Sequence, residues 1–545
     1  MLVTPFLQLA HAFEPGVPYK LSAELTSNGN VFSDFQFTPD GTHVIYRANG
    51  NNGEIDLFQA SISSGDVINL TEDASSSGSG DVLSFKISND GQKIVYWLIN
   101  SGEQSLWAKL PGLTLRISGT LAATLPTLIL DFTISDDSSR VVYRAQTSMP
   151  FVASRLFVKR IEQPSAAQPN RIGRELVPGG GIRLYQFVPN SNTVVYYGDV
   201  RTAGVLEIFF TPADFLSSTI VLNPPLAAMR DVRSDFSISP DGQYVVYRAD
   251  ARIDEVTELY RSTLTSPVQA IKLNPNNLAA SEEVGDFKIS PDSKRVVYRS
   301  DERIDDVAEL FSVPINNAGG DLAVRISDSL IADGDVIEYK ISPNSARVTY
   351  LADQEVDEKI ELFSGLISGL SVSSLTPNLA DNDDVVSYEF NQSGSRVVYL
   401  ARVSNSQQLR SVRIFGGDDL PLNPPLAINA NVLKDYRTSP SSDRVFYRAD
   451  QINSTVFELF STEIEGPITS NVRLNTGFLT LSEQDVFGFQ ISPDGKFLVY
   501  RADQDRDQQF ELFAVNLEDN GDFEENDTVC VPIKARNGNL AVICL

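Results

Sequence analysis

The sequence repeats one phrase at a steady interval along its length. Residues 238–250 read ISPDGQYVVYRAD, and residues 489–503 read FQISPDGKFLVYRAD. Aligning the phrases on their tyrosine gives ten units with spacings of 47 to 53 residues: Tyr46, Tyr96, Tyr143, Tyr196, Tyr247, Tyr298, Tyr350, Tyr399, Tyr447 and Tyr500. A period of roughly 50 residues is typical of propeller blades and of solenoid arrays.

The pattern inside each unit distinguishes these two architectures. A unit begins with a strand such as 287–290, turns on Ser-Pro-Asp-Gly, and continues into a second strand such as 245–248, in which neighbouring residues are both apolar. Such a strand must be buried on both faces. A third strand of the type 309–311 and a fourth of the type 324–327 follow. Four antiparallel strands per unit, packed face to face between neighbouring units, predict β-propeller blades.

The ends of the chain predict that the blades close into one ring. Tyr19-Lys20-Leu21-Ser22 matches the fourth-strand pattern of residues 472–475, yet it precedes the first complete unit. The tenth unit reaches Phe513 and then runs into acidic residues without a fourth strand. We therefore predict an all-β protein with a single ten-bladed propeller over residues 13–516, in which the N-terminal strand completes the last blade. Two smaller rings are the alternative.

The repeat phrase resembles that of a known family. The Ser-Pro-Asp-Gly-x-x-Val-Val-Tyr phrase of residues 239–247, which recurs in related form at 492–500, is similar to the TolB-type, WD-like propeller repeat. The resemblance covers residues 19–515, although units three, four, eight and nine lose part of the turn and ten blades exceed the number usual in that family. It implies a propeller fold and protein binding at a cell envelope, the latter as an expectation from fold alone.

The first residues resemble an export signal. An apolar stretch from Leu2 to Leu9 runs into Ala10-His11-Ala12, the small-x-small pattern that signal peptidase accepts. We interpret residues 1–12 as the remnant of a signal peptide and expect a periplasmic or extracellular protein. An ordinary apolar N-terminal segment is the alternative.

The two cysteines lie close together near the end of the chain. Cys530 and Cys544 flank Asn537-Gly538, a strong hairpin turn signal, after an acidic linker at 517–528. A register centred on this turn sets the cysteines opposite each other, so we predict a short disulfide-linked C-terminal hairpin at 529–545. Two free thiols in a reducing compartment are the alternative.

The charge of the chain excludes some partners. Acidic residues outnumber basic ones 71 to 44, and the formal charge of −27 repels nucleic acid and anionic membrane surfaces. No apolar run reaches the roughly 20 residues of a membrane-spanning helix. We expect neither nucleic-acid binding nor membrane insertion.

Acidic residues gather in the loops between second and third strands. We select Asp254, Asp305, Asp357 and Asp505 as candidate partner-binding residues, because these loops share one face of a propeller. A carboxylate-rich rim also suits calcium or a basic protein. No segment follows the D-x-D-x-D-G spacing, so we predict no cofactor and keep calcium as the alternative.

Arginine and glutamate recur ten residues apart, as in Arg248 with Glu258 and Arg501 with Glu511. On adjacent antiparallel strands this spacing predicts a structural cross-strand ion pair. A ring of ligand-binding arginines is the alternative.

One segment reverses the overall charge. Between Arg144 and Arg183 there are seven basic residues and two acidic ones, and the segment also contains an irregular insert. We select Arg155, Lys159, Arg160, Arg171 and Arg174 as a candidate dock for an acidic partner or for the acidic rim of another copy. A degenerate blade with a solvated edge is the alternative, and salt-sensitive oligomers would indicate self-association.

Few catalytic groups are available. Histidine occurs only at His11 and His43, which leaves too little for Ser-His-Asp or Cys-His catalysis, and no G-x-S-x-G elbow or glycine-rich phosphate loop is present. We therefore predict that the chain is not an enzyme. We expect an exported, non-catalytic scaffold that binds a protein or peptide through its loop faces and channel. A glycan-binding or glycan-active propeller that uses paired carboxylates is the alternative.

Overall fold

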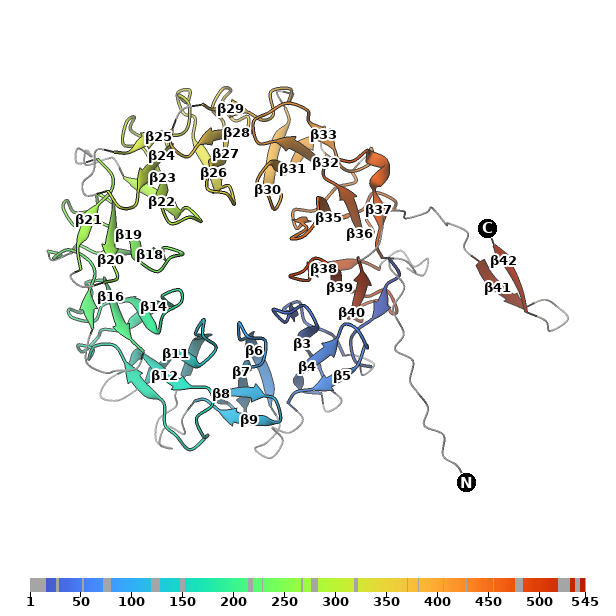
Figure 1. Ribbon diagram of the computed structural model, residues 1–545, viewed down its shortest axis with the longest axis horizontal. Helices are drawn as coiled ribbons and strands as arrows, with labels where there is room; N and C mark the ends of the chain where they lie inside the picture. The colour runs from blue at the N-terminus through green and yellow to red at the C-terminus, as the bar shows by residue number, and fades with distance from the viewer. Residues whose placement is uncertain are drawn as a thin grey trace.

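The described part of the chain forms one closed ring of ten four-stranded antiparallel sheets, which confirms the predicted fold class (Figure 1). The computed structural model describes these residues, the last two ranges by their backbone alone: 16–25, 29–50, 53–71, 80–118, 128–147, 152–213, 219–227, 229–265, 268–275, 283–317, 322–369, 371–380, 382–404, 406–426, 429–453, 455–475, 484–517, 530–534 and 540–544. The predicted signal segment and nearly all of the acidic linker lie outside these ranges. No helix in the described ranges is long and apolar enough to span a membrane.

Blades 1 to 5 each use four consecutive strands, of which the first lies innermost in the ring and the last outermost. Blade 1 contains β2 (Gln36–Phe37), β3 (His43–Asn49), β4 (Ile55–Ser61) and β5 (Val67–Asn69). Blade 2 contains β6 (Asp81–Ile87), β7 (Ile94–Asn100), β8 (Glu103–Leu110) and β9 (Leu113–Arg116). Blade 3 contains β10 (Leu128–Ile134), β11 (Arg140–Thr147), β12 (Ala153–Arg160) and β13 (Asn170–Ile172). Blade 4 contains β14 (Ile182–Phe187), β15 (Thr193–Gly198), β16 (Glu207–Pro212) and β17 (Ile220–Val221); blade 5 contains β18 (Val232–Ile238), β19 (Tyr244–Ala249), β20 (Glu258–Thr263) and β21 (Ala270–Lys272).

Blades 6 to 9 repeat this order, and blade 10 takes its outermost strand from the N-terminus. Blade 6 contains β22 (Val284–Ile289), β23 (Arg295–Ser300), β24 (Glu309–Pro314) and β25 (Val324–Arg325). Blade 7 contains β26 (Val336–Ile341), β27 (Arg347–Ala352), β28 (Glu361–Leu366) and β29 (Ser373–Ser374). Blade 8 contains β30 (Asp384–Phe390), β31 (Arg396–Val403), β32 (Ser406–Arg413) and β33 (Leu420–Pro421). Blade 9 contains β34 (Arg437–Thr438), β35 (Arg444–Ala449), β36 (Glu458–Glu463), the short 3₁₀ helix η2 (Ile468–Ser470) and β37 (Val472–Arg473); blade 10 contains β38 (Val486–Ile491), β39 (Phe497–Ala502), β40 (Glu511–Asn516) and β1 (Tyr19–Lys20).

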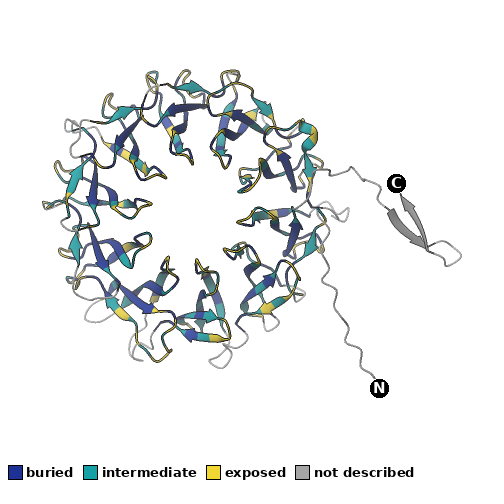
Figure 2. Cartoon of the chain, viewed as in Figure 1, coloured by how far each residue is buried: buried dark blue, intermediate teal, exposed yellow. Residues whose placement is uncertain are grey.

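The core consists of apolar layers between neighbouring blades, and the two middle strands of each sheet carry most of it (Figure 2). Val296 packs toward blade 5 while Val297 packs toward blade 7, which explains why adjacent residues of a second strand are both apolar. The repeated tyrosine lies fully buried and stacks on the aromatic residue opposite it, as Tyr298 does on Phe311 with ring centroids 5.5 Å apart.

The hydroxyl groups of these tyrosines do not all have the same surroundings. Tyr247 donates to the carbonyl of Leu222 at 3.1 Å and lies 3.2 Å from the Ser262 hydroxyl, whereas the buried Tyr96 hydroxyl has no hydrogen-bond partner among the described residues. We expect Tyr247→Phe to cost about 1 kcal/mol of unfolding free energy and Tyr96→Phe to be neutral or stabilising. Urea unfolding of the two variants checks this, and equal losses in both would contradict it.

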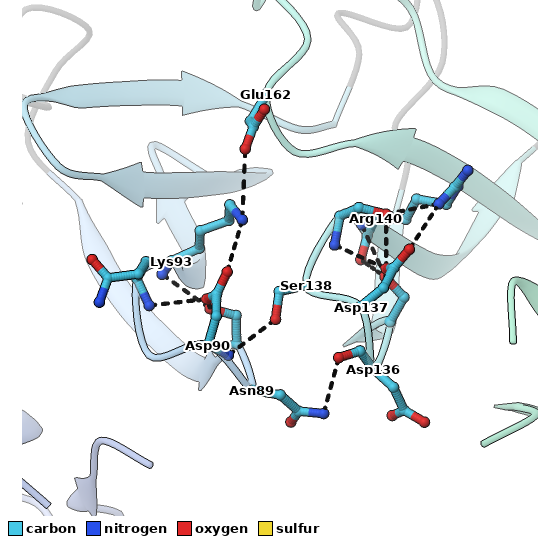
Figure 3. Close-up of polar contacts among 12 residues, drawn as sticks. Asn89, Asp90, Lys93, Asp136, Asp137, Ser138, Arg140 and Glu162 are labelled. Atoms are coloured by element: carbon cyan, nitrogen blue, oxygen red, sulfur yellow. Dashed lines mark hydrogen bonds and ion pairs between the residues drawn. The ribbon is translucent and has the colours of Figure 1, made fainter. Parts of the chain in front are cut away.

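In several blades the turn that follows the innermost strand binds the next turn around the ring. In blade 2 the Ser88 hydroxyl donates to Asp90 at 2.5 Å, and the backbone N–H of Asp90 donates to the Ser138 hydroxyl of blade 3 at 3.1 Å (Figure 3). Ser138 replaces the glycine of the repeat phrase and keeps its left-handed backbone, with φ at 57°. The Ser138 hydroxyl at this strained position accepts a bond between blades that a glycine could not accept.

These turns predict how stability depends on pH. The Thr38 hydroxyl bond is the main cause that lowers the pKa of Asp40; for Asp90, Asp137 and Asp292, partial burial raises the pKa, but hydroxyl and backbone bonds outweigh it and the pKa lies below its usual value. A lowered folded pKa stabilises the protein above the unfolded pKa of roughly 4, and this contribution disappears as the pH falls through the folded pKa. We expect the urea midpoint to fall steeply below about pH 4, and Asp292→Asn to reduce that slope. An unchanged slope in the variant would contradict the assignment.

The predicted ion pair between Arg248 and Glu258 is wrong. In the observed register Arg248 lies opposite Leu259, so that Arg248 and Glu258 point to opposite faces of the sheet. Arg248 instead pairs with Asp235 of its own innermost strand at 2.7 Å and donates to the carbonyl of Val284 in the next blade at 2.7 Å. This arginine therefore joins neighbouring blades.

The glutamate of the repeat is buried at the start of the third strand. It occurs in the described part of six blades as Glu207, Glu258, Glu309, Glu361, Glu458 and Glu511. Glu309 accepts from Arg303 at 2.9 Å and from Arg325 at 2.7 Å, whereas Arg473, at 3.0 Å, is the one described cation that pairs with Glu458. Burial raises the pKa of Glu458, an effect that Arg473 opposes without cancelling it.

The predicted closure of the ring by the N-terminal strand is confirmed. In blade 10, β1 pairs with β40, with Tyr19 opposite Ala514 and Lys20 opposite Phe513. Leu21 follows the strand, donates its N–H to the carbonyl of Leu512 at 2.8 Å and is fully buried. Lys20 forms an ion pair with Glu511 at 2.5 Å.

The C-terminal segment forms a hairpin in the described backbone. β41 (Cys530–Lys534) pairs with β42 (Leu540–Cys544), and Cys530 is the direct partner of Cys544, as the turn signal predicts. The cysteine side chains lie outside the described part of the structure, so the disulfide stays a prediction.

Candidate functional site

The loops between second and third strands and the loops between blades form one surface, which we call the loop face. In blades 5, 6, 7, 9 and 10 the first kind of loop comprises residues 250–257, 301–308, 353–360, 450–457 and 503–510, equal in length. The two kinds of loop bind each other. The N–H of Ala308 donates to Asp335 at 2.7 Å, and the N–H of Asp335 donates to Asp353 at 2.6 Å.

Many acidic residues of the loop face serve to hold these loops. Asp250, Asp353 and Asp503 each accept a backbone N–H from the loop that leads into their own blade. Partial burial raises the pKa of Asp485, which accepts the N–H of Phe457 at 2.6 Å. Among the described residues, no group of three His, Cys, Asp or Glu residues is placed to hold a metal ion.

The outermost residues of three loops repeat one arrangement. Ile253, Ile304 and Val356 are exposed by 42%, 48% and 44%, and each is followed by an exposed aspartate: Asp254, Asp305 and Asp357. The backbone turns back directly afterwards, with left-handed residues at Glu255, Asp306 and Glu358. We call this set of three apolar and three acidic side chains the loop-tip row. None of its aspartates forms an ion pair with another described residue, so that part of the chain leaves all three carboxylates unneutralised.

Asp505 does not belong to this row. It occupies an earlier position of its loop than the other three aspartates and lies 4.0 Å from Lys20. The structure therefore brings together three of the four predicted acidic residues.

The predicted basic residues of blade 3 do not share one surface. Arg155 and Lys159 are exposed by only 4% and 2%, and Lys159 donates to the carbonyls of Arg116 and Pro164. Arg171 pairs with Glu175, whereas Arg160 and Arg174 are exposed. Their role in partner binding stays a prediction.

Aromatic side chains gather where blade 10 meets blade 1. Phe487 is exposed by 41% on the innermost strand and meets Phe510 edge to face at 4.6 Å. The Arg501 guanidinium lies 4.0 Å from the centre of the Phe510 ring and donates to the carbonyl of Val31 at 2.7 Å. This cluster is an exposed aromatic surface of the kind that a sugar ligand would require.

The sequence prediction missed the apolar members of the loop-tip row. Acidic residues drew attention to these loops, whereas Ile253, Ile304 and Val356 looked like ordinary loop residues. A large aliphatic residue at the same place in three polar loops was the available signal, because such residues are usually buried.

Comparisons with known proteins do not assign the chain to a family. No protein-family model and no curated protein match the chain. Similar solved structures include dipeptidyl peptidase 4 of Porphyromonas gingivalis, at 12% identity and a TM-score of 0.45 over 76% of this chain and 64% of that one. Prolyl oligopeptidase B from Galerina marginata is similar at 12% identity and a TM-score of 0.35 over 69% of this chain and 55% of that one. An oligogalacturonate lyase in complex with manganese is similar at 12% identity and a TM-score of 0.34 over 65% of this chain and 94% of that one. The chain spans less than two thirds of either peptidase.

These matches correct one expectation. The prediction that the chain is not an enzyme is contradicted, because the similar structures are a dipeptidyl peptidase, a prolyl oligopeptidase and a lyase. At 12% identity and TM-scores of 0.34 to 0.45, the likeness assigns no reaction to this chain.

Proposed function

We propose that the propeller is a scaffold whose loop-tip row binds a cationic, partly apolar segment of a protein or peptide. The observation that carries this proposal is the repetition, in three successive blades, of an exposed aliphatic residue followed by an aspartate that no described cation neutralises. Such a surface combines apolar area with negative charge, so it suits a ligand in which basic and apolar side chains alternate.

The ligand would contact several blades at once. Each aliphatic side chain that becomes buried contributes about 1–2 kcal/mol before the cost of association is subtracted, so one blade alone would bind weakly. When one ligand contacts three blades at once, the binding free energies of the separate contacts add. We therefore expect an extended segment in preference to a single side chain.

The test compares peptide binding by variants on the two sides of the ring. Ile304→Ser and Asp305→Lys should each weaken binding of a fluorescent peptide of alternating lysine and leucine at least about fivefold, which corresponds to about 1 kcal/mol. Asp418→Lys is the matched control, since Asp418 is an exposed aspartate after the third strand of blade 8, on the opposite side of the ring. If Asp418→Lys weakened peptide binding equally, the effect of Asp305→Lys would come from net charge alone, and the proposal would be overturned.

A glycan ligand at the aromatic cluster is the second candidate. Its support is the exposed Phe487 beside Phe510. The neighbouring Asp485 and Asp503 already accept backbone N–H groups, which favours the peptide proposal over paired-carboxylate chemistry. Glycan binding that Phe487→Ala abolishes, and that Asp305→Lys leaves intact, would reverse this preference.

We further propose a TolB-type repeat and an exported location, at the periplasm or cell exterior. The repeat phrase supports the first, and the N-terminal apolar segment together with the paired positions of Cys530 and Cys544 supports the second. Self-association through acidic and basic surfaces is a separate alternative that sizing columns at low and high salt would reveal.

A further inference from the structure

An arginine begins the second strand in five blades of the described chain, on the side of the ring opposite the loop face. These residues are Arg140, Arg295, Arg347, Arg396 and Arg444. In blades 6, 7 and 8 the guanidinium donates through Nε to a serine hydroxyl of the third strand: Arg295 to Ser312 at 2.6 Å, Arg347 to Ser364 at 2.8 Å and Arg396 to Ser411 at 2.8 Å. We call this side the turn face, because it carries the turns after the innermost strands.

The five arginines differ in whether a carboxylate balances them. Arg140 pairs with Asp137 at 3.3 Å, Arg396 with Glu465 at 3.4 Å and Arg444 with Glu463 at 3.7 Å. Within the described residues, Arg295 and Arg347 have no carboxylate within 4.0 Å, although Arg347 is only 4% exposed. Burial lowers the pKa of both guanidiniums from its ordinary value.

Blade 5 provides a third guanidinium of this kind by a different route. Tyr244 takes the first position of its second strand, and Arg261 of the third strand lies 5.0 Å from the centre of the Tyr244 ring. Arg261 is 6% exposed and donates through Nη2 to the carbonyl of Asn317 at 3.2 Å, and its buried Nε has no partner among the described residues. Three adjacent blades therefore each hold a guanidinium that forms no ion pair with a described carboxylate, buried in Arg261 and Arg347 and half-buried in Arg295.

A cavity of about 440 Å³ lies among these blades on the turn face. Its wall includes Tyr244, Lys294, Arg295, Pro314, Ile315 and Ile367. Asp292 also lines the cavity, lies 3.6 Å from Lys294 and accepts from the Ser290 hydroxyl with its other oxygen. Its charge raises the pKa of Arg295 against the larger effect of burial, but the two groups form no ion pair within 4.0 Å. The cavity thus combines a positive charge with an aromatic ring and aliphatic walls.

Burying a guanidinium without a counter-ion is costly, and the cost is recovered when an anion binds there. Arginine binds planar carboxylates through two parallel N–H bonds. The described bonds of Arg295 use Nε and one N–H of Nη2, so Nη1 and the second N–H of Nη2 are left for such a ligand. Pro314, Ile315, Ile367 and the Tyr244 ring offer contact to an apolar body. We propose that this cavity binds the carboxylate of an organic acid or acidic peptide that carries an apolar or aromatic group. The site is distinct from the loop-tip row, lies on the opposite face and prefers the opposite charge.

The test measures ligand-induced stabilisation of the full chain at constant ionic strength. Phenylacetate should raise the thermal midpoint in a saturable way, with half-saturation below about 10 mM, and should bind more tightly than acetate or inorganic phosphate. Arg295→Met should weaken phenylacetate at least tenfold. Arg295→Lys keeps the positive charge but loses the two parallel N–H donors, so it should retain part of the affinity for phenylacetate. Binding retained by this variant also shows that a loss in Arg295→Met does not come from misfolding.

Arg444→Met is the matched control, because Arg444 holds the same position in blade 9 but faces Glu463. This control should leave phenylacetate binding unchanged. Equal loss of binding in Arg444→Met and Arg295→Met, or the absence of saturation, would overturn the proposal. Tighter binding of phosphate than of phenylacetate would overturn its carboxylate specificity.

Discussion

A chain that begins at Ser22 should lose a large part of its stability and should no longer form a closed ring. The truncation removes β1 and the fully buried Leu21, and leaves the edge of β40 without its partner strand. Loss of the Leu21 side chain alone costs about 2–5 kcal/mol, and an unpaired strand edge favours aggregation. Chemical unfolding should show a lower midpoint, and small-angle scattering should show a larger particle.

Two controls separate ring closure from simple loss of core packing. Leu474 is the residue of blade 9 that follows the outermost strand in the same way, and it is also fully buried. Leu21→Ala and Leu474→Ala should therefore cost similar free energies while both rings stay closed. A synthetic peptide of residues 16–25 added to the truncated chain should restore part of the lost stability. An unchanged midpoint and scattering curve after truncation would contradict the role of β1.

Arg473→Met should destabilise the protein more than Arg325→Met does. Glu458 is 1% exposed and has Arg473 as its one described cation, whereas the equally buried Glu309 keeps Arg303 after Arg325 is removed. Leaving a buried carboxylate without its cation costs roughly 3–5 kcal/mol, and we expect the lower end because the Arg473 side chain is 38% exposed. Urea unfolding at neutral pH measures the difference between the two variants.

The Arg473→Met variant should also recover stability in acid. Burial already raises the pKa of Glu458, and loss of Arg473 raises it further. A carboxyl group with a raised folded pKa favours the folded state below the unfolded pKa of roughly 4.5, and this contribution is lost as the pH rises through the folded pKa. The deficit relative to Arg325→Met should therefore shrink between neutral pH and about pH 5. A deficit independent of pH would contradict the assignment to Glu458.

The fold could be predicted because residues close together in the sequence determine the strands and turns of each unit. The tyrosine phrase marks a strand buried on both faces, and Tyr19-Lys20-Leu21-Ser22 carries the fourth-strand pattern to the opposite end of the chain. Interactions between blades were harder to predict from the sequence. The error at Arg248 arose because its partners, Asp235 and the carbonyl of Val284, depend on the strand register and on the neighbouring blade.

The candidate sites could be predicted only in part, for a similar reason. The sequence located Asp254, Asp305 and Asp357, but burial was needed to show that Ile253 and its counterparts are exposed. The guanidiniums of Arg261, Arg295 and Arg347 look ordinary in the sequence. What distinguishes them is that no carboxylate in the described ranges forms an ion pair with them, and an ion pair is recognised only in three dimensions.

The N-terminal closure also determines the order in which the protein can fold. The backbone N–H of Leu512 bonds to Ser22 across 490 residues of sequence, and that of Phe510 bonds to Asn30 across 480. During synthesis the first strand emerges long before its partner exists, so blades 1 to 9 can assemble while the last sheet waits for residues near 512. Contacts between residues so far apart in the sequence form slowly, because the chain between them loses conformational entropy before the contacts stabilise the fold. The joining of the two ends should therefore be the final and rate-limiting step of folding.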